Sequence, residues 1–275
     1  MKFAMKSLVA AAAFVAVGAA SAATAADYTW SVVSGSGGLT FSADALSALS
    51  ASSSSVITAG TIPTIAGLPN GGATNTAVYT KATGNVSLTF NDAGITGTTL
   101  DSLSAANSLV QIRRTTFNDD ETTTTRSIYL SNFDVNLSNS TISAEVFSRQ
   151  DSNALVSYGK LVVYKADVPG VSGGTGGNIV IDTETATGAT GHASGSLNGS
   201  LRFDAGTADI VLTGLGLSTA ATDPVAILVR TANWGTTQAS GNFVGVPAVP
   251  EPSTYALLGA GMLAVGAMAR RRKAA

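Results

Sequence analysis

The sequence contains no cysteine and only one histidine, His192, in 275 residues. A chain without cysteine has no disulfide to stabilise it and no thiolate to attack a substrate or bind a metal. A single histidine without cysteine does not supply the ligands that zinc usually takes. We therefore expect no metal centre and no cofactor, and a stability that depends on the size of the hydrophobic core.

Basic side chains are scarce outside the two ends of the chain. Of 15 Lys and Arg residues, six lie in the terminal segments, whereas all 17 Asp and Glu residues lie between positions 27 and 251. The six are Lys2, Lys6, Arg270, Arg271, Arg272 and Lys273. The part from 27 to 252 thus carries nine basic and 17 acidic residues, a net charge of −8. Nucleic-acid binding requires clustered Lys and Arg, so we expect no nucleic-acid partner.

The N-terminus has the pattern of a secretory signal peptide. Lys2 and Lys6 form a basic region, 7–20 is an apolar run of small residues, and Ala20-Ser21-Ala22 is the small-x-small pattern that signal peptidase accepts. The apolar run is shorter than the roughly 20 residues needed to span a bilayer, which disfavours the alternative of an uncut anchor. We expect a signal peptide over 1–26, cleaved at about 22–26.

The C-terminal tail contains a second apolar run, followed by a basic cluster. Fifteen residues, 255–269, precede Arg270, Arg271, Arg272 and Lys273. As a helix they cover about 22 Å, against a hydrocarbon core of about 30 Å, so this helix spans a membrane only with help from its flanks. The basic cluster favours the cytoplasmic side. We expect a transmembrane helix over 255–269, a cytoplasmic tail over 270–275, and a linker over 245–254 outside the membrane.

A proline-rich motif lies just before this apolar run. Its residues are Val249, Pro250, Glu251, Pro252, Ser253 and Thr254. The prolines fix the backbone in an extended form and remove hydrogen-bond donors, which leaves the segment accessible to a processing enzyme.

The order of motif, short apolar helix and terminal arginines resembles the PEP-CTERM sorting signal of Gram-negative bacteria, over about 249–273. The resemblance implies that an exosortase, a membrane cysteine protease or transpeptidase, acts on the tail after a transient stay in the inner membrane. It also implies delivery to the cell surface or extracellular matrix, often in association with exopolysaccharide. The alternative is an ordinary tail anchor behind a proline-rich stalk.

The segment between the two ends predicts an all-β domain over 27–244. Short runs rich in Val, Ile, Thr, Tyr and Phe, several of them alternating, end in Gly, Asn, Asp or Ser. The predicted strands are 28–33, 86–90, 108–113, 126–130, 133–137, 141–147, 154–164, 179–182, 200–203, 209–212 and 225–231. This pattern indicates a β-sandwich or a related β-architecture, in one domain or two.

One short helix is expected over 45–49, with Ser42 or Asp44 as its N-cap and with Leu46 and Leu49 on one face. The polar stretch 51–55 is expected to be a spacer and 62–72 a loop. A further break covers 168–177, which we interpret as a long hairpin loop rather than a domain boundary.

Two patterns raise the question of catalysis or ion binding by this break. Gly170-Val171-Ser172-Gly173-Gly174 matches the G-x-S-x-G elbow of hydrolases, and Asp182 and His192 follow in the order of that triad. The elbow requires a strand before it and a helix after it, whereas glycines and a β-rich run follow here, so we expect no triad and an exposed loop at His192. The stretch 173–181 also resembles a calcium-binding nonapeptide, but Asn178 replaces its ligand Asp and there is no second copy.

The densest acidic cluster is Asp119, Asp120 and Glu121, between two predicted strands. Carboxylate oxygens make these residues weak calcium candidates, and the alternative is a solvated hairpin tip facing Arg113, Arg114 or Arg126. Trp30 and Trp234, the only tryptophans, either form a platform for sugars or pack in the core, and we expect the core.

Two classes of function remain in competition. The leading expectation is a non-catalytic surface or matrix protein of a biofilm, sorted by an exosortase and associated with exopolysaccharide. The second is a secreted hydrolase or carbohydrate-binding module that acts on matrix polymers. Convergent carboxylates or a Ser172, Asp182, His192 triad would distinguish an enzyme from a structural protein.

Overall fold

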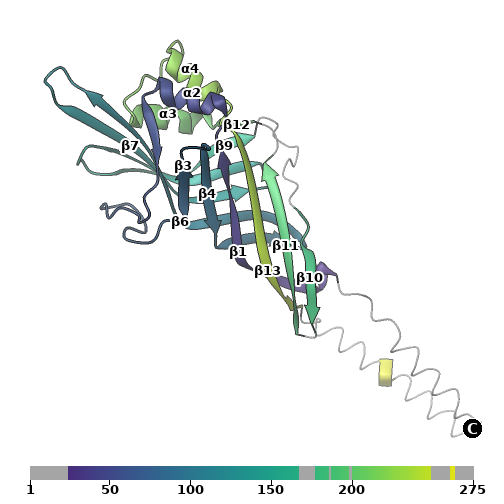
Figure 1. Cartoon of the computed structure of the whole chain (residues 1–275). Coiled ribbons are helices and arrows are strands. Elements are labelled where there is room, and N and C mark those ends of the chain that lie inside the picture. The colour runs from purple at the N-terminus through teal and green to yellow at the C-terminus, as the bar shows by residue number, and fades with distance from the viewer. Residues whose placement is uncertain (1–23, 167–176, 186, 198–199, 249–260, 264–275) are drawn as a thin grey trace, which may run out of the picture.

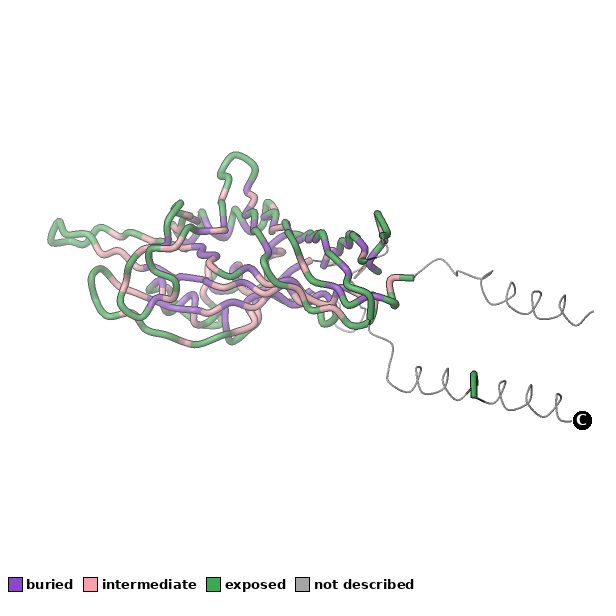
Figure 2. The backbone as a smooth tube through the Cα atoms, turned by 90° about the horizontal axis from the view of Figure 1, so that it is seen from below, coloured by how far each residue is buried: buried purple, intermediate pink, exposed green. Residues whose placement is uncertain are grey.

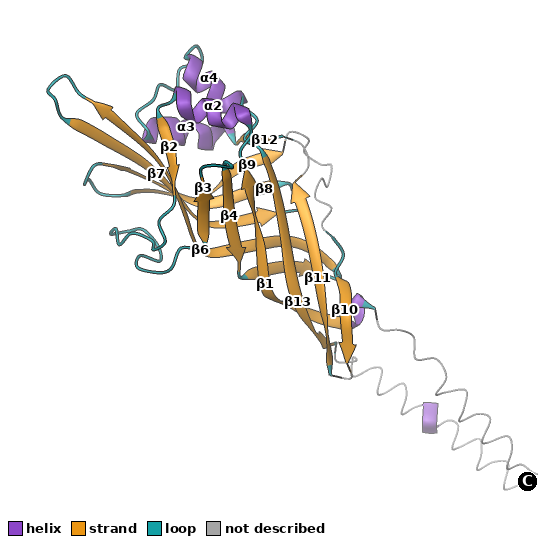
Figure 3. Cartoon of the chain, viewed as in Figure 1, coloured by secondary structure: helices purple, strands orange, loops and turns teal. Residues whose placement is uncertain are grey.

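The protein is a β-sandwich of two antiparallel sheets, as the sequence predicts (Figures 1 and 3). A computed structural model describes residues 24–166, 177–185, 187–197, 200–248 and 261–263. The helices gather at one end of the sandwich, and the first residues of β1 and the last residues of β13 lie at the other. No described helix is long and apolar enough to cross a membrane. The expected transmembrane segment 255–269 lies outside the described residues, apart from a helical turn at 261–263.

The first sheet has six strands and contains both the first and the last strand of the domain. Their order is β10 (Val180–Thr185), β11 (Gly188–Leu197), β13 (Thr236–Pro247), β1 (Tyr28–Thr40), β4 (Asn85–Phe90) and β3 (Ala77–Thr80). β1 and β13 pair along nearly their whole length, from Tyr28↔Pro247 to Thr40↔Thr236. The sheet therefore extends to Pro247 rather than ending at 244, the boundary expected from the sequence.

The second sheet has six strands in one path, and a further strand pairs with one of them. The path is β12 (Leu201–Phe203), β9 (Val156–Ala166), β8 (Thr141–Gln150), β7 (Thr123–Asn136), β6 (Thr99–Phe117) and β2 (Ser54–Ile57), and β5 (Asp92–Thr96) pairs with β6. β7 joins the predicted strands 126–130 and 133–137, with a register shift between Ser131 and Asp134. The strand β2 corrects the expected polar spacer over 51–55.

A single hydrophobic core lies between the two sheets, because alternate residues of each strand point inward. β1 shows how this pattern is kept around an irregularity. Tyr28 and Trp30 are buried before the register shift at Val33, and Leu39 is buried after it, so the inward positions change from even to odd numbers. Figure 2 shows buried positions along the middle of the sandwich and exposed ones in its loops and hairpin tip. One shared core indicates one domain.

Small residues on the inner side of the first sheet leave room for large aromatic rings. A Cβ atom on Gly191 or Gly245 would lie 3.2 Å or 2.9 Å from the indole of Trp30. A Cβ on Gly37 would similarly lie 2.7 Å from the ring of Phe90. Trp30 and Phe90 are buried. The glycine content of these strands therefore serves packing rather than flexibility.

Three α-helices pack at one end of the sandwich, where one was expected: α2 (Ala43–Ala51), α3 (Ala205–Gly214) and α4 (Pro224–Thr231). Ser42 is the N-cap of α2, since its Oγ accepts a hydrogen bond from the Ala45 amide at 3.2 Å. Leu49 is buried, but Leu46 is 42 % exposed, so the two do not share a buried face as expected.

The predicted strands 209–212 and 225–231 are wrong, because these residues form α3 and α4. Each helix has an aspartate N-cap. Asp204 accepts from the Gly206 amide, and Asp223 accepts from the Val225 and Ala226 amides, with Pro224 in the first turn. β-branched side chains suggested strands, but the caps and the packing of the helical face determine the structure.

The expected loop 62–72 covers the outer side of the second sheet and forms a small core of its own. Ile62 and Leu68 are buried there against Leu109, Tyr129 and Phe147. The buried amide of Asn75 fixes the end of the loop, because it donates to the carbonyls of Ala59 and Leu109 at 2.9 Å. Beyond Arg114 and Arg126, β6 and β7 pair only with each other and project as a long hairpin (Figure 1).

Candidate functional surface

The two ends of the folded domain lie side by side, at the end of the sandwich opposite the helices. Tyr28 pairs with Pro247, and the Ala248 amide donates to the Asp27 carbonyl at 2.8 Å. The segments predicted for export and for sorting therefore leave the fold from one place. The predicted sorting residues 249–254, the basic cluster 270–273, and Ala20 and Ala22 of the signal cleavage site lie outside the described residues.

The N-terminal turn is part of the domain rather than a loose end. The side chain of Asp27 accepts hydrogen bonds from the Thr24 amide at 2.6 Å and the Thr24 hydroxyl at 2.9 Å, and these bonds lower the pKa of Asp27. The Trp30 indole donates to the Ala25 carbonyl at 2.8 Å. Cleavage after Ala22 would keep this turn intact, whereas cleavage after Ala25 would remove part of it.

The outer surface of the first sheet is polar and almost free of charge. We call it the hydroxyl face, defined by the outward side chains of β4, β1, β13 and β11. Among them are Ser34, Ser36, Gln238, Ser240, Asn242 and Ser194. None of these four strands contains Asp, Glu, Lys or Arg. In Figure 1 this face is turned toward the viewer.

Polar groups on the hydroxyl face bond to one another across the strands. Ser194, Ser240, Ser36 and Thr89 form one row over four strands. In that row the hydroxyls of Ser36 and Ser240 lie 3.3 Å apart, and the amide of Asn242 donates to Ser34 at 3.2 Å in the next row. Such cross-strand pairs stabilise the sheet and reduce the number of groups that need water.

The half of the hydroxyl face toward the helices is hollowed, whereas the half toward the chain ends carries protruding apolar side chains. Toward the helices, a shallow hollow of about 410 Å³ is lined by short residues, including Ser36, Ser196 and Ser240. Toward the chain ends, valines stand out, with exposed fractions of 64 % for Val33, 41 % for Val244 and 62 % for Val246. The outer side of the second sheet, in contrast, carries charge, such as the Lys160–Asp134 ion pair and Glu145, which accepts from Asn132.

Two of the three residues that match the triad order, Asp182 and His192, come together although no triad was expected. Asp182 Oδ1 and His192 Nδ1 lie 2.6 Å apart, with both side chains about half exposed. His192 is exposed as expected, but it lies in strand β11 rather than in a loop. Ser172 lies outside the described residues. Asn178 of the nonapeptide pattern accepts a hydrogen bond from the Thr99 hydroxyl at 3.1 Å.

The acidic cluster is the tip of the β6–β7 hairpin, and its side chains serve the turn. Asp120 Oδ1 accepts from the hydroxyl and the amide of Thr122 at 2.6 Å and 3.1 Å, which lowers the pKa of Asp120. Within the described residues no three acidic or histidine side chains are grouped to hold a metal ion. Asp119, Asp120 and Glu121 thus lie at an exposed hairpin tip, as the alternative interpretation expects, and calcium binding by them stays a prediction. Arg114 turns away to donate to the Leu215 carbonyl.

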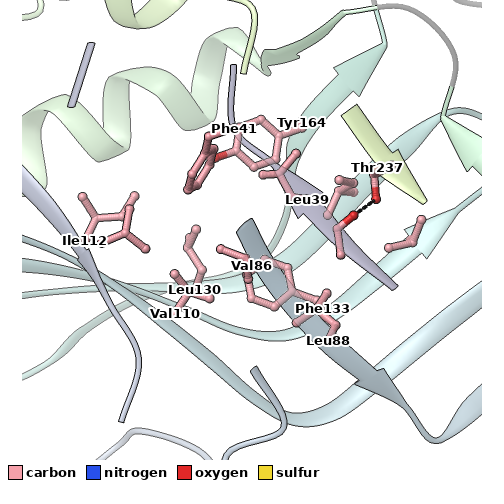
Figure 4. Close-up of a pocket in the computed structure, with 14 residues that line it drawn as sticks. Leu39, Phe41, Val86, Leu88, Val110, Ile112, Leu130, Phe133, Tyr164 and Thr237 are labelled. Carbon is pink, nitrogen blue, oxygen red and sulfur yellow. Dashed lines mark hydrogen bonds between the residues drawn. The ribbon is translucent and has the colours of Figure 1, made fainter. Parts of the chain in front are cut away.

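Both tryptophans pack in the core, as predicted, and neither forms an exposed platform. The centre of the sandwich holds an apolar cavity of about 30 Å³, with side chains from both sheets pointing toward one another (Figure 4). In this view Thr237 donates to the Gly38 carbonyl at 2.6 Å. A cavity of this size holds about one or two waters, so it is not a ligand site.

The hydroxyl face was not predicted, because β11 and β13 were not recognised as strands. A signal was present. From 237 to 246, the residues at odd positions are Thr, Ala, Gly, Phe and Gly, and those at even positions are Gln, Ser, Asn, Val and Val. This is a period of two, hidden by the small size of the inward residues.

Comparisons with known proteins agree with the C-terminal pattern. Residues 248–273 match the family model of the PEP-CTERM protein-sorting motif. Curated protein sequences give no match. A solved structure, the C-terminal domain of HtaA from Corynebacterium glutamicum, is similar to this chain. The match covers 78 % of this chain and 99 % of the HtaA chain, at 12 % sequence identity and a TM-score of 0.39. The tail is a PEP-CTERM sorting motif, and the chain is an exported protein that an exosortase-type system sorts.

Proposed function

We propose that the protein is a non-catalytic component of the cell surface or extracellular matrix of a Gram-negative biofilm, where it is associated with exopolysaccharide. Export and sorting deliver a folded β-sandwich, which acts as a structural component rather than as an enzyme. The carrying observation is that the sorting motif begins at residue 248, one residue after the last strand. No separate domain lies between the fold and the signal, so the enzyme that reads the tail works directly beside the sheet.

The anchoring steps of this proposal follow from the lengths of the segments. Residues 248–254 reach at most about 24 Å when fully extended, so the predicted helix 255–269 holds the sandwich close to the membrane. Weak hydrophobicity and the basic cluster 270–273 make this helix a temporary stop. Signal peptidase removes 1–22, and the exosortase then separates the domain from its anchor.

The test is the C-terminal mass of the mature protein, measured together with cell fractionation. We expect the wild type to have lost the apolar helix and the basic cluster. Glu251→Ala should instead keep the full tail and stay in the inner-membrane fraction. The matched control is Asp119→Ala, which removes one exposed carboxylate from the hairpin tip and should be processed normally. Residues 270–273 still attached to the mature surface form would contradict the proposal.

Association with the matrix needs its own measurement. We expect the processed protein to co-sediment with exopolysaccharide from the producing cells, and to be lost to the medium when that polymer is digested. An identical distribution with and without the polymer would restrict the proposal to surface delivery.

A secreted hydrolase is the second candidate, and one observation favours it. The Asp182–His192 pair has the contact by which an aspartate orients a histidine base. The purified protein should then cleave an ester or glycan substrate, and Ser172→Ala and His192→Ala should abolish that activity, while Ser194→Ala should keep it. Loss of a real activity in the first two variants would overturn the non-catalytic assignment.

A further inference from the structure

The outer side of the first sheet, which includes the hydroxyl face, exposes several large apolar side chains. Five large apolar side chains with exposed fractions between 41 and 64 % lie on the outer side of the first sheet. They are Val33, Val78, Val180, Val244 and Val246. Three of them, Val33, Val244 and Val246, belong to the neighbouring strands β1 and β13 of the hydroxyl face, in its half toward the chain ends. Exposed apolar side chains grouped in this way indicate an interaction surface.

We propose that this face packs against the same face of a second copy of the chain. Electrostatics favours that partner. The exported part carries a net charge of −8, so most surfaces of two copies repel each other. The four central strands have no charged residue besides the ionisable His192, whose partner Asp182 lies at the margin. Two copies therefore meet here without like-charge repulsion.

The polar groups of the face can enter an interface without losing their partners. Ser36 bonds to Ser240, Asn242 to Ser34, and Thr183 to Thr190 at 2.5 Å, all within one copy. Burial of a polar group is costly only if it leaves that group unpaired. These three pairs keep their hydrogen bonds in an interface, which lowers the desolvation cost of the face. The hollow beside them has room for water, which interfaces commonly contain.

The size of the face matches a stable dimer. The four strands of the hydroxyl face contribute 41 residues. Each residue occupies about 16 Å² of sheet, from a rise of about 3.4 Å and a strand spacing of about 4.8 Å. The face therefore covers about 660 Å², within the range of about 600–1,000 Å² that each partner buries in a standard stable interface. Short side chains allow the two sheets to approach to about 10 Å.

The position of the sorting tail sets the orientation of the two copies, and this step alone rests on the proposed function. Both copies are held by the same membrane at the end where Pro247 leaves the sheet. Facing sheets then have their strands in the same direction, related by a two-fold axis along the strands. Because β13 and β1 are the two central strands of the face, that axis places Val244 and Val246 of one copy against β1 of the other, at the same height along the strands.

A neutral polysaccharide is the competing occupant, and the structure favours it less. Recognition of sugars uses unpaired polar groups together with exposed aromatic rings. On this face Ser36 is paired with Ser240 and Asn242 with Ser34, and the aromatic side chains of the four strands, among them Trp30, Phe90 and Phe243, are buried.

Sedimentation equilibrium of the mature protein released from cells tests the dimer. We expect twice the monomer mass for the wild type. Val244→Lys should raise the dissociation constant by at least about tenfold, because each copy would then bury an ammonium group in the interface. The matched control is Val156→Lys. Val156 is 51 % exposed on the second sheet, and this variant should remain a dimer. Circular dichroism checks that both variants are folded.

Cross-linking supplies a measurement that does not depend on weakening the interface. The chain has no cysteine, so Ser240→Cys introduces a single thiol near the axis. Facing sheets about 10 Å apart are too distant for a disulfide, but a short bis-maleimide should join two copies. Val156→Cys should not be joined.

Three results would overturn the proposal: a wild type that stays monomeric at about 100 µM, well above the dissociation constants of stable dimers; a Val244→Lys variant that dimerises like the wild type; or a monomer that binds neutral polysaccharide through this face. Failure of tail processing would appear in the C-terminal mass and would affect only the orientation; the sedimentation would then use the unprocessed chain extracted in detergent.

Discussion

Replacing Trp234 with alanine tests whether the helical end of the sandwich depends on one aromatic cluster. Trp234 is 2 % exposed and lies between α4 and β13. Its ring centroid lies 4.5 Å from that of Phe203, 5.9 Å from Tyr164 and 6.2 Å from Phe41. The cluster therefore connects the end of β1, the end of β9 and the short strand β12 with the segment after α4.

The expected loss of unfolding free energy is large. A buried tryptophan removes about 200 Å² from water, which is worth about 5 kcal/mol at about 25 cal/mol per Å². Substitutions of buried aromatic residues by alanine cost about 3–5 kcal/mol. The indole also donates to the Val229 carbonyl at 3.0 Å. Trp234→Phe keeps most ring contacts but loses this bond, so we expect it to cost about 2 kcal/mol.

Urea unfolding followed by far-ultraviolet circular dichroism measures both variants, and fluorescence of the remaining Trp30 gives a second probe. Val156→Ala, at a half-exposed position, is the matched control and should change stability by less than about 0.5 kcal/mol. If Trp234→Ala cost less than about 1 kcal/mol, the cluster would not support the helical end, and the packing argument would be wrong.

Three further predictions concern single contacts. Asp223→Ala should cost about 1 kcal/mol in urea unfolding, because it removes the N-cap that accepts from two amides of α4. Gly235→Ala should cost more than about 2 kcal/mol, since Gly235 has φ +125 and a Cβ there would lie 1.9 Å from the Thr40 carbonyl oxygen, whereas Gly60→Ala, with nothing within 4 Å, should be neutral. Asp204→Asn should cost about 0.5 kcal/mol at pH 7, because the partly exposed Lys165, at 2.6 Å, and the helix amides lower the pKa of Asp204. This loss should be constant above the ordinary aspartate pKa near 4 and should vanish as the pH falls through the lower pKa of the folded state, as pH-dependent unfolding would show.

Strands with large β-branched or aromatic residues could be predicted from the sequence, and strands with small residues could not. The predicted runs 86–90 and 141–147 alternate clearly and lie in β4 and β8. β11 alternates as regularly, with buried Ala189 and Ala193, but its glycines and serines are typical of turns. Gly191 of β11 and Gly245 of β13 are needed as glycines because the indole of Trp30, which is distant in the sequence, lies over them. No local pattern contains that information.

The helices α3 and α4 could have been predicted from their first residues. Asp223-Pro224 combines an N-cap residue with proline in the first helical turn, and Asp204 precedes Ala205 in the same way. The run 225–231 then has to satisfy a helical period, with Ala226 and Val229 buried three residues apart. Here the start signal outweighs β-propensity, because propensity is a weak preference that packing overrides.

One part of the candidate functional surface could be predicted from the sequence and another part could not. Asp182 and His192 were identified by sequence order alone, and the pairing of β10 with β11 brings them together. The hydroxyl face could not be identified, because it requires the register of four strands from four separate parts of the chain. Its lack of charge is visible in the sequence only once those strands are known to be neighbours.

The pairing of β1 with β13 also connects folding to sorting. β13 lies between β11 and β1, so before residue 247 is exported the first sheet is divided into β3-β4-β1 and β10-β11. The six-stranded sheet is complete only after β13 has been exported and has paired with β11 and β1. The sorting motif begins at the next residue, 248. The reach of 248–254, at most about 24 Å, then keeps a closed sheet beside the membrane while the tail is still attached. An exosortase that acts at this stage meets its motif directly beside a folded domain, and a cut within 248–273 leaves β13 in the mature chain.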